Sequence, residues 1–339
     1  MGATAEILGK TCSAPIVVGP HVLSGAAFLA PMSGVTDVVM RRIARRFGAS
    51  MTVTEMVAAE AYVEGDAQTL LRAEGCGVGL HMVQIAGRSP VAMARAARAA
   101  CDAGAAIVDL NMGCPAKKVV GGYAGAALMR DLSLAAAIIR AVVAAADHPV
   151  TLKMRLGWDE GSVNAPELAR IAQSEGVALL TVHGRTRSQF YAGAADRAAI
   201  RAVKESVSIP VVANGDCASL ADARAMLAAS GADGVMIGRA AVGQPWLVGE
   251  IARGLAGEAL HVPAAARLEA ALEHYEGLLR LFGREQGVRH ARKHLAAYAD
   301  RSGAPPDALL RARLVTTEEP REARALLAAL FEPIHAEAA

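Results

Sequence analysis

Short apolar runs alternate with longer amphipathic segments along most of the chain. The apolar runs cover residues 28–32, 51–56, 80–85, 107–112, 150–156, 179–183, 210–214 and 234–238. Segments with helical spacing follow several of them, for example at 91–102, 134–146, 165–175 and 220–229. Strands that are buried on both faces of a parallel sheet are expected to be almost continuously apolar. The pattern therefore predicts eight strand–helix units.

The number and size of these units predict an α/β fold class. Eight units between residues 26 and 253 fit a (β/α)8 TIM barrel, a domain of roughly 250 residues. A doubly wound open sheet is the alternative, but eight units without a long interruption exceed most sheets of that kind. Within the N-terminal segment 1–25, the turn residues Gly19 and Pro20 predict a short hairpin at 15–24 that caps the barrel.

The pattern changes after the predicted barrel. Apolar positions recur at helical spacing over 268–282 and again over 288–298. A third segment opens with two prolines at 305–306, and a fourth covers 321–331. We therefore expect residues 254–339 to form a small C-terminal helical domain.

Composition excludes several classes of protein. The chain is 53% hydrophobic and 20% charged, which is enough apolar material for a core and gives no sign of general disorder. The strongest apolar stretch, at 134–146, is interrupted by Arg140 and is too short to span a bilayer. The N-terminus lacks the basic start and apolar run of a signal peptide. We therefore expect a cytoplasmic protein without a membrane partner.

Net charge and cysteine content argue against further classes of protein. The net charge is only +2, so any contact with nucleic acid must come from local basic patches. The five cysteines are scattered and form no CxxC pair, which argues against a disulfide framework and against a structural zinc site. No metal site is therefore predicted, and nothing in the sequence indicates an obligate protein partner.

Polar side chains end nearly every predicted strand. In a barrel the carboxyl ends of all strands meet at one face, where barrel enzymes place their chemistry. A ring of polar groups at that face predicts a binding or catalytic site, although some members are expected only to bond loop backbone. The ring consists of Ser33, Glu55, Gln84, Asn111, Lys153, Arg155, His183, Arg185, Asn214, Asp216 and Arg239.

The loops after the last two predicted strands carry a phosphate-binding signal. Asn214-Gly215-Asp216 and Gly238-Arg239 each precede a helix, and barrels commonly hold a phosphate in these two loops. Glycine permits close backbone approach, a helix start offers free N–H groups, and Arg239 adds positive charge. We therefore expect a phosphate-bearing ligand, with two simple tight turns as the alternative.

Lys153 and Cys114 are the candidate reactive side chains. Lys153 lies on a predicted inner strand, where a buried ammonium group needs an anionic partner. It could be a Schiff-base nucleophile, as in an aldolase, or a cation beside an anionic cofactor, and sequence spacing does not separate these two roles. Cys114 stands in a long glycine-rich loop that we expect to move as a lid, and a protonated thiol there can act as a general acid.

Basic residues in two regions are candidates for contact with RNA. Arg289, Arg292 and Lys293 share one face of a predicted helix in the C-terminal domain. Further basic residues stand near the predicted mouth of the barrel, at Lys117, Lys118, Arg185 and Arg187. A solvated charged surface is the alternative interpretation of both groups.

Several stretches together resemble the tRNA-dihydrouridine synthase family, most closely its bacterial B-type branch. The most specific are NMGCPAKKV at 111–119 and HGRTR at 183–187. APMSGVTD at 30–37, VVANGD at 211–216 and GVRHARKHLAAY at 287–298 also match. The resemblance covers nearly the whole chain, whereas the NGD and IGR segments alone would fit many flavin barrels.

The resemblance implies FMN as the cofactor and NADPH as the electron donor. It assigns to FMN the residues Pro31, Met32, Ser33, Gln84, Lys153, His183, Asn214, Gly215, Asp216, Gly238 and Arg239. It further implies that Cys114 is the proton donor, that His183 and Arg185 lie beside the flavin and the substrate, and that Asn111 contacts the uracil.

The implied reaction is the reduction of the C5–C6 bond of a tRNA uridine to 5,6-dihydrouridine. A hydride goes to uracil C6 and Cys114 protonates C5, while Lys153 stabilises negative charge on the reduced flavin. A base within folded tRNA must be flipped into the pocket, where the barrel mouth and the helical domain could clamp it. Alternatives are an FMN barrel acting on a free pyrimidine, a lysine-dependent aldolase and a non-catalytic RNA-binding regulatory protein.

Overall fold

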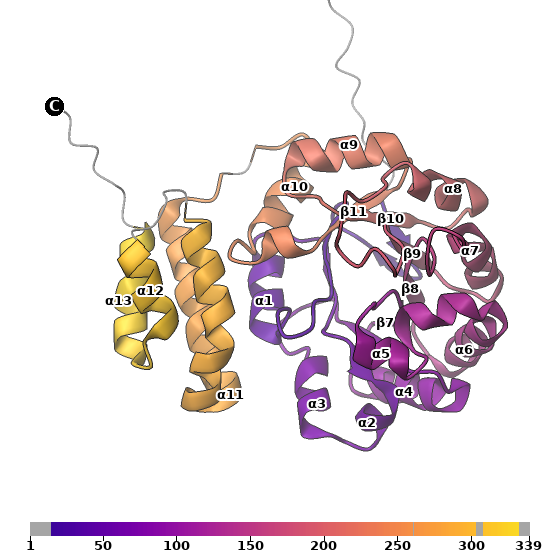
Figure 1. Ribbon diagram of the computed structural model, residues 1–339, viewed down its shortest axis with the longest axis horizontal. Coiled ribbons are helices and arrows are strands. Elements are labelled where there is room, and N and C mark those ends of the chain that lie inside the picture. The colour runs from indigo at the N-terminus through magenta and orange to yellow at the C-terminus, as the bar shows by residue number, and fades with distance from the viewer. Residues whose placement is uncertain (1–14, 260, 303–307, 332–339) are drawn as a thin grey trace, which may run out of the picture.

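A ring of parallel strands surrounded by helices makes up the larger part of the molecule (Figure 1). The computed structural model describes residues 15–259, 261–302 and 308–331. The strands of the ring are β3 (Ala27–Leu29), β4 (Met51–Thr52), β5 (Val57–Ala58), β6 (Met82–Ala86), β7 (Ile107–Met112), β8 (Val150–Arg155), β9 (Leu179–His183), β10 (Val211–Asn214) and β11 (Gly234–Ile237).

Two short strands close the ring. β4 pairs with β3 and β5 pairs with β6, and Val53 between them bridges to Met82 of β6. β4 and β5 are therefore two parts of one barrel strand, which joins the first strand to the third. Each of the eight predicted apolar runs overlaps a strand of this ring. The predicted (β/α)8 barrel is thus confirmed.

Helices follow the strands around the outside of the barrel. The longer ones are α1 (Val38–Arg46), α4 (Pro90–Asp102), α6 (Leu132–Ala145), α7 (Ala165–Ser174), α8 (Ala199–Ser206), α9 (Leu220–Ser230) and α10 (Leu247–Leu255). The shorter ones are α2 (Ala59–Val63), α3 (Ala67–Ala73), α5 (Lys117–Gly121) and the 3-10 helices η1 (Gly125–Arg130) and η2 (Arg239–Ala241). Among the described residues, no helix combines the length and the apolar character that crossing a membrane requires.

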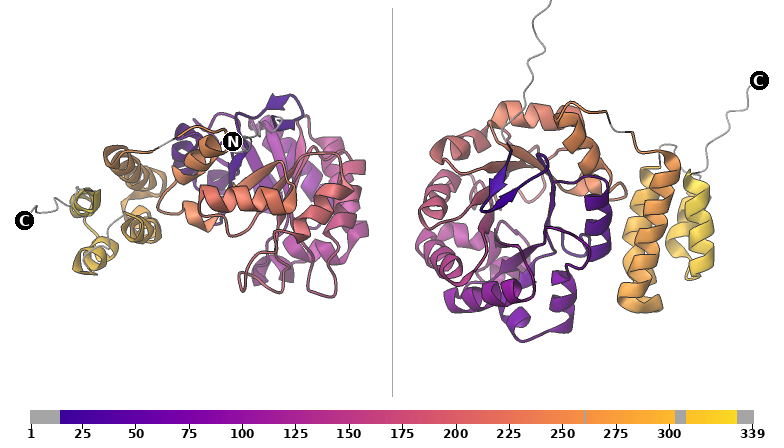
Figure 2. Two further views of the ribbon diagram at one scale, coloured as in Figure 1. Left: turned by 90° about the horizontal axis from the view of Figure 1, so that it is seen from above. Right: turned by 180° about the vertical axis from the view of Figure 1, so that it is seen from behind.

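A two-stranded hairpin lies across the end of the barrel opposite the strand carboxyl ends (Figure 2). β1 (Val17–Val18) and β2 (His21–Val22) pair in antiparallel fashion within the segment predicted to form a hairpin. Ile16, Val18 and Leu23 pack in one buried cluster with inward-facing residues of the barrel strands. This end of the barrel is therefore filled with apolar side chains.

The C-terminal helices form a bundle beside α1 (Figure 1). α11 (Ala264–Asp300) is broken at Gly283, whose φ of 75° is left-handed, so its two halves correspond to two of the predicted helices. α12 (Ala308–Thr316) and α13 (Pro320–Phe331) complete the bundle, while the two prolines at 305–306 lie outside the described residues. The apolar core of the bundle extends onto Val39 and Ile43 of α1. The helical domain is therefore packed against the barrel.

The connection between barrel and bundle lies between Leu255, where α10 ends, and Ala264, where α11 begins. Before α10, the indole ring of Trp246 stacks on Tyr298 of α11 with 6.2 Å between ring centroids. Gly243 lies directly against α11, since a Cβ atom there would come within 2.3 Å of the Ala297 backbone. The bundle is thus held close to the loop that follows β11.

Candidate active site

A cavity of about 770 Å³ is lined by loops at the carboxyl end of the barrel strands. This volume falls in the range of about 300–1,000 Å³ that is usual for pockets that bind small molecules. All the residues predicted to bind the cofactor line it, together with Asn111 and Cys114. These residues are Pro31, Met32, Ser33, Gln84, Asn111, Cys114, Lys153, His183, Asn214, Gly215, Asp216, Gly238 and Arg239.

A chain of buried hydrogen bonds fixes the polar side chains in one part of the cavity. Asp109 accepts hydrogen bonds from Gln84 Nε2 at 2.7 Å and from Thr151 Oγ1 at 2.6 Å. Asn111 Nδ2 donates to Gln84 Oε1 at 2.8 Å, and Asn111 Oδ1 accepts the backbone N–H of Cys114 at 2.9 Å. Burial raises the pKa of Asp109. The network sets the orientation of both amides and anchors the start of the Cys114 loop.

Lys153 extends into the cavity from β8. Its Nζ donates to Asn214 Oδ1 at 3.0 Å, and Asn214 Nδ2 donates to the Met236 carbonyl oxygen at 2.8 Å. Burial, together with the nearby Arg155, lowers the pKa of Lys153 to about 8. The amine is therefore mostly a buried cation at neutral pH. Such a group is suited to an anionic ligand, because burial of an unpaired charge is costly.

His183 stands at the end of β9, near several cations. Burial, followed by the charges of Lys153 and Arg155, lowers the pKa of His183 to about 2. The imidazole ring is therefore neutral at physiological pH. It can donate or accept a hydrogen bond toward a ligand, but it does not add positive charge to the site.

Asp216 joins two loops at the rim of the cavity. Its carboxylate accepts hydrogen bonds from Arg185 at 2.6 and 3.0 Å, from Arg239 at 3.2 Å and from the Ala195 N–H at 2.8 Å. Burial alone would raise the pKa of Asp216, but the bonds from Arg185 and Ala195 lower it. The preceding Gly215 has a φ of 130°, and a Cβ atom there would lie 2.5 Å from that of Ala195. The close approach of these loops therefore requires glycine.

Arg185 has several partners within the protein. Its side chain is almost fully buried, and besides Asp216 it bonds the backbone carbonyls of Ala192 and Gly193. A guanidinium group engaged in this way holds the loop after β9 in place, and its predicted contact with the substrate stays a prediction. The neighbouring Arg187 is half-buried and lies over the ring of Trp158 at 4.6 Å.

The predicted lid contains regular structure. After Cys114 the chain forms α5 and then η1, and the thiol itself is partly exposed at the cavity. Lys117 and Lys118 begin α5 and are exposed. The two lysines therefore flank the cavity on the side of the candidate proton donor.

The predicted basic face of the helical domain lies on the second half of α11. Arg289 forms an ion pair with Glu285 at 2.7 Å, and Arg292 forms one with Glu318 at 3.3 Å. Lys293 is exposed, and its Nζ lies close to Gly34, in the loop that follows β3. The three residues are thus outside the cavity, with Lys293 nearest to its rim.

Sequence reasoning missed several residues of the cavity. Tyr191 is about half exposed and lies 4.8 Å from the Arg239 guanidinium, measured to the ring centroid. The aromatic pair Phe190-Tyr191 in a polar loop directly after HGRTR was the available signal. Arg301 also lines the cavity, at the end of α11. Only the packing of the helical domain brings Arg301 there, so the sequence offers no signal for it.

Sequence comparison places the chain among known proteins. The family model for dihydrouridine synthase matches residues 28–336. A probable tRNA-dihydrouridine synthase of Rhizobium leguminosarum bv. phaseoli is 51% identical over 299 residues, which cover 88% of this chain and 93% of the relative. tRNA-dihydrouridine synthase B of Xanthomonas axonopodis pv. citri is 47% identical over 320 residues, which cover 94% and 96%.

Two solved structures share the barrel fold. Morphinone reductase has a TM-score of 0.53 at 15% identity, covering 74% of this chain and 90% of its own. An old yellow enzyme homologue from Zymomonas mobilis has a TM-score of 0.51 at 16% identity, and the match covers 69% of this chain and 90% of the homologue. At such low identity these two structures are evidence for the barrel alone. The family match over most of the chain, with close relatives of nearly equal length, shows that this protein belongs to the dihydrouridine synthase family.

Proposed function

We propose that this protein is an FMN-dependent tRNA-dihydrouridine synthase that reduces the C5–C6 bond of specific uridines in tRNA, with NADPH as the electron donor. The observation that carries the proposal is the cavity in which a buried cation, an amide network and a thiol meet. Lys153, Gln84, Asn111 and Cys114 supply these groups. The names of the relatives support tRNA as the substrate. We place the reaction in the cytoplasm.

The donor set of the cavity fits a flavin with its phosphate. Gly215 brings the loop after β10 into close contact with its neighbours, and Arg239 stands at the next loop with a side chain that is 62% exposed. Arg239 can therefore bond a phosphate while Asp216 keeps it in place. Lys153, Asn214 and Gln84 provide polar groups for the ring system. FMN, once bound here and reduced by NADPH, would supply the hydride for the substrate.

The side chains of the protein hold the proton and the charges of the reaction. Cys114 lines the cavity, and its Sγ is the group assigned to deliver a proton to uracil C5. Asn111 bonds Gln84 through one of its two amide hydrogens, so the second remains able to donate to a uracil carbonyl. Lys153 balances negative charge in the site. Neutral His183 contributes a hydrogen bond without adding a second cation.

The helical domain is proposed to bind tRNA. It contributes Arg301 to the lining of the cavity and places Lys293 beside the loop after β3. Lys117 and Lys118 are exposed at the start of α5, in the segment that follows Cys114, and are further candidates for contact with the RNA. In this proposal the segment 1–25 caps the barrel, 26–253 bind the cofactor and 254–339 bind the RNA, although the structure describes only residues 15–259, 261–302 and 308–331 of these segments.

The test combines cofactor release with product analysis. Denatured protein should release FMN, and protein reloaded with FMN should form dihydrouridine in tRNA taken from a strain that lacks this gene, with NADPH consumed in parallel. Failure to bind FMN even after soaking would contradict the cofactor assignment. Bound FMN with reduction of free uracil derivatives, but of no tRNA, would instead favour an enzyme acting on free pyrimidines.

A further inference from the structure

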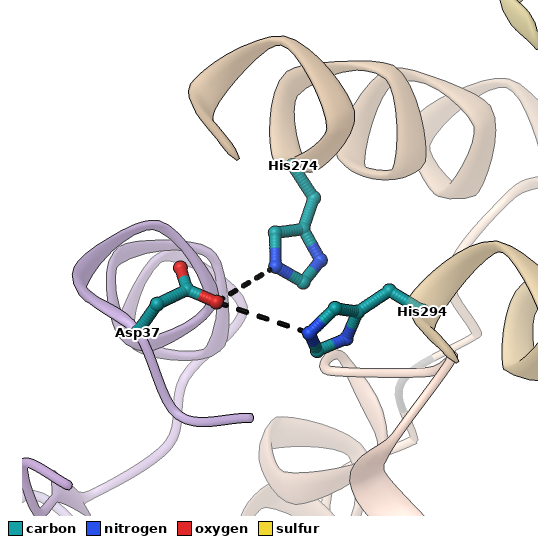
Figure 3. Close-up of side chains that lie close together, drawn as sticks. All are labelled: Asp37, His274 and His294. Carbon is teal, nitrogen blue, oxygen red and sulfur yellow. Dashed lines mark hydrogen bonds and ion pairs between the residues drawn. The ribbon is translucent and has the colours of Figure 1, made fainter. Parts of the chain in front are cut away.

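A buried cluster of one carboxylate and two imidazole rings joins the barrel to the helical domain (Figure 3). Asp37 caps the start of α1, His274 lies on the first half of α11, and His294 lies on the second half. Asp37 Oδ2 is 3.2 Å from His274 Nε2 and 4.0 Å from His294 Nε2. One ligand atom from each residue lies within 4.8 Å of the others, and all three residues are buried.

His294 lacks hydrogen bonds that a buried ring normally makes. Within the described part of the chain, neither of its ring nitrogens has a hydrogen-bond partner, although its side chain is only 3% exposed. Its Nε2 faces the Asp37 carboxylate at a distance too long for a hydrogen bond. Buried polar atoms are rarely left unsatisfied in native proteins. An additional group between the ring and the carboxylate would give His294 Nε2 a partner.

The other two members of the cluster are already oriented as ligands would be. Asp37 uses Oδ1 to accept the Val39 and Met40 N–H groups at 2.9 and 3.0 Å, which leaves Oδ2 directed at the rings. His274 Nδ1 lies 3.1 Å from the Tyr298 hydroxyl, which leaves Nε2 for the cluster. Histidine ligands of metals are commonly fixed by such a hydrogen bond at the second nitrogen.

We propose that Asp37, His274 and His294 bind a divalent transition-metal ion, of which Zn²⁺ is the best match, between the barrel and the helical domain. Two imidazole nitrogens and one carboxylate oxygen suit Zn²⁺, with bonds of about 2.0–2.2 Å and a water as fourth ligand. Ligand atoms in such a site lie roughly 3.3–3.5 Å apart. The Asp37–His274 pair has nearly this spacing, and His294 Nε2 would need to move about 0.5–0.7 Å closer to Asp37 Oδ2.

Arg41 and Glu55 are the charged side chains of the barrel that act on Asp37, with opposite signs. The ligands come from positions far apart in the sequence, which explains why no spacing motif predicted them.

The proposed ion would link the barrel to the helical domain. The loop that precedes Asp37 contributes Met32, Ser33 and Val35 to the lining of the cavity. An ion at Asp37 would therefore fix the helical domain relative to that loop. The proposal does not rest on the flavin chemistry, because none of the three ligands lines the cavity.

The test measures metal binding by the full-length protein without a histidine tag. After treatment with a chelator, the protein should bind about one Co²⁺ per chain with visible absorption bands of four-coordinate cobalt, and Zn²⁺ should displace it. Zn²⁺ should also raise the melting temperature of the wild type. His294→Asn and His274→Asn should lose the bands. His290→Asn, on the same helix with its ring stacked on Phe282, should keep them.

Several outcomes would overturn the proposal. These are a folded wild type without bound metal or cobalt bands, or equal binding by wild type and His294→Asn. The cluster would then be a set of hydrogen-bonding groups only. If a variant fails to fold, as circular dichroism would reveal, the wild-type stoichiometry and spectrum decide the question alone. FMN content of the same samples is expected to be unchanged, which separates this test from that of the proposed function.

Discussion

The cavity and the basic face of α11 both contain charged side chains, but they hold them in different ways. In the cavity, Lys153 is half-buried and bonded to Asn214 from another strand. On α11, Arg289 and its partner Glu285 are 67% and 81% exposed. Exposed pairs of this kind contribute about 0–1 kcal/mol and can exchange partners. The difference indicates that the cavity is preorganised for chemistry, whereas the α11 face can rearrange around a flexible anion.

The largest expected effect is a loss of activity when the Cys114 thiol is removed. Cys114→Ala should slow dihydrouridine formation by about 10²–10⁴-fold, because the protonation step loses its acid. FMN binding, tRNA binding and flavin reduction by NADPH should remain. Cys217→Ala is the matched control, since this cysteine lines the same cavity but is buried, with its pKa raised by burial to about 11. Equal turnover by wild type and Cys114→Ala would exclude the assigned role.

The next effect concerns the buried cation. Lys153→Met should weaken FMN binding by about 10–100-fold, the equivalent of a lost charge-assisted hydrogen bond of about 1.5–3 kcal/mol. The pKa of Lys153 is about 8 without ligand, so the amine is charged below that pH and must take up a proton to meet an anion above it. Wild-type affinity should therefore fall as pH rises above about 8, and the variant should show no such fall. Titrations with FMN, followed by flavin fluorescence at a series of pH values, measure the affinity of the wild type and of the variant. A wild-type affinity that does not change with pH would contradict the role assigned to Lys153.

An intermediate effect is expected at the carboxylate that joins the rim loops. Asp216→Asn removes the partner of buried Arg185, which for a fully buried pair costs about 3–5 kcal/mol. Because the Asp216 side chain is 32% exposed, we expect about 1–3 kcal/mol in the free energy of unfolding. Denaturant unfolding at neutral pH measures this. Asp147→Asn, from an exposed pair with Arg98, should change stability by less than about 0.5 kcal/mol.

The ion pair between Asp216 and Arg185 also predicts how the free energy of unfolding depends on pH. The pKa of Asp216 is lower in the folded state than in the unfolded chain, where it is about 3.9. The ionised Asp216 carboxylate therefore contributes its full stabilisation at pH values above its pKa in the unfolded chain. This stabilisation is lost as the pH falls through the pKa of Asp216 in the folded protein. The stability difference between wild type and Asp216→Asn should shrink in this acidic range. A constant difference would show that hydrogen bonding without charge accounts for the effect.

The smallest expected effect is a change in tRNA affinity when charges on the basic face of α11 are removed. The triple variant Arg289→Ala, Arg292→Ala, Lys293→Ala should weaken tRNA binding several-fold and lower the salt slope by about one or less per lost contact. The reverse change, Glu285→Ala with Glu318→Ala, should strengthen binding, because it frees both arginines from their partners. Reduction of the flavin by NADPH should be unaffected in both. Unchanged affinity and slope in both variants would mean that this face is only solvated surface.

Much of the barrel and its cavity could be predicted from the sequence for a simple geometric reason. β6 to β10 are buried on both faces, so each appears as an apolar run. Parallel connection then forces their carboxyl ends to one side. Any polar residue at the end of a run, such as Gln84 or His183, therefore had to lie near the others.

Side-chain partners could not be predicted in the same way. Arg185 has the same position at a strand end as the cavity residues, and only the folding of the following loop over it turns it toward Asp216. Asp109 sits within an apolar strand and gives no sign of its bonds to Gln84 and Thr151. Arg301 reaches the cavity only because the helical domain packs against α1.

The sequence by itself determined the eight strand–helix units, the helices of the C-terminal domain and the residues that share the cavity, because all of these follow from local periodicity and chain direction. Tertiary structure decided which polar groups bond to one another and how the two domains meet. The Asp37–His274–His294 cluster shows the reason most clearly, since it joins side chains separated by 237 residues of sequence. Contacts of that kind depend on the packing of whole helices, which no local pattern records.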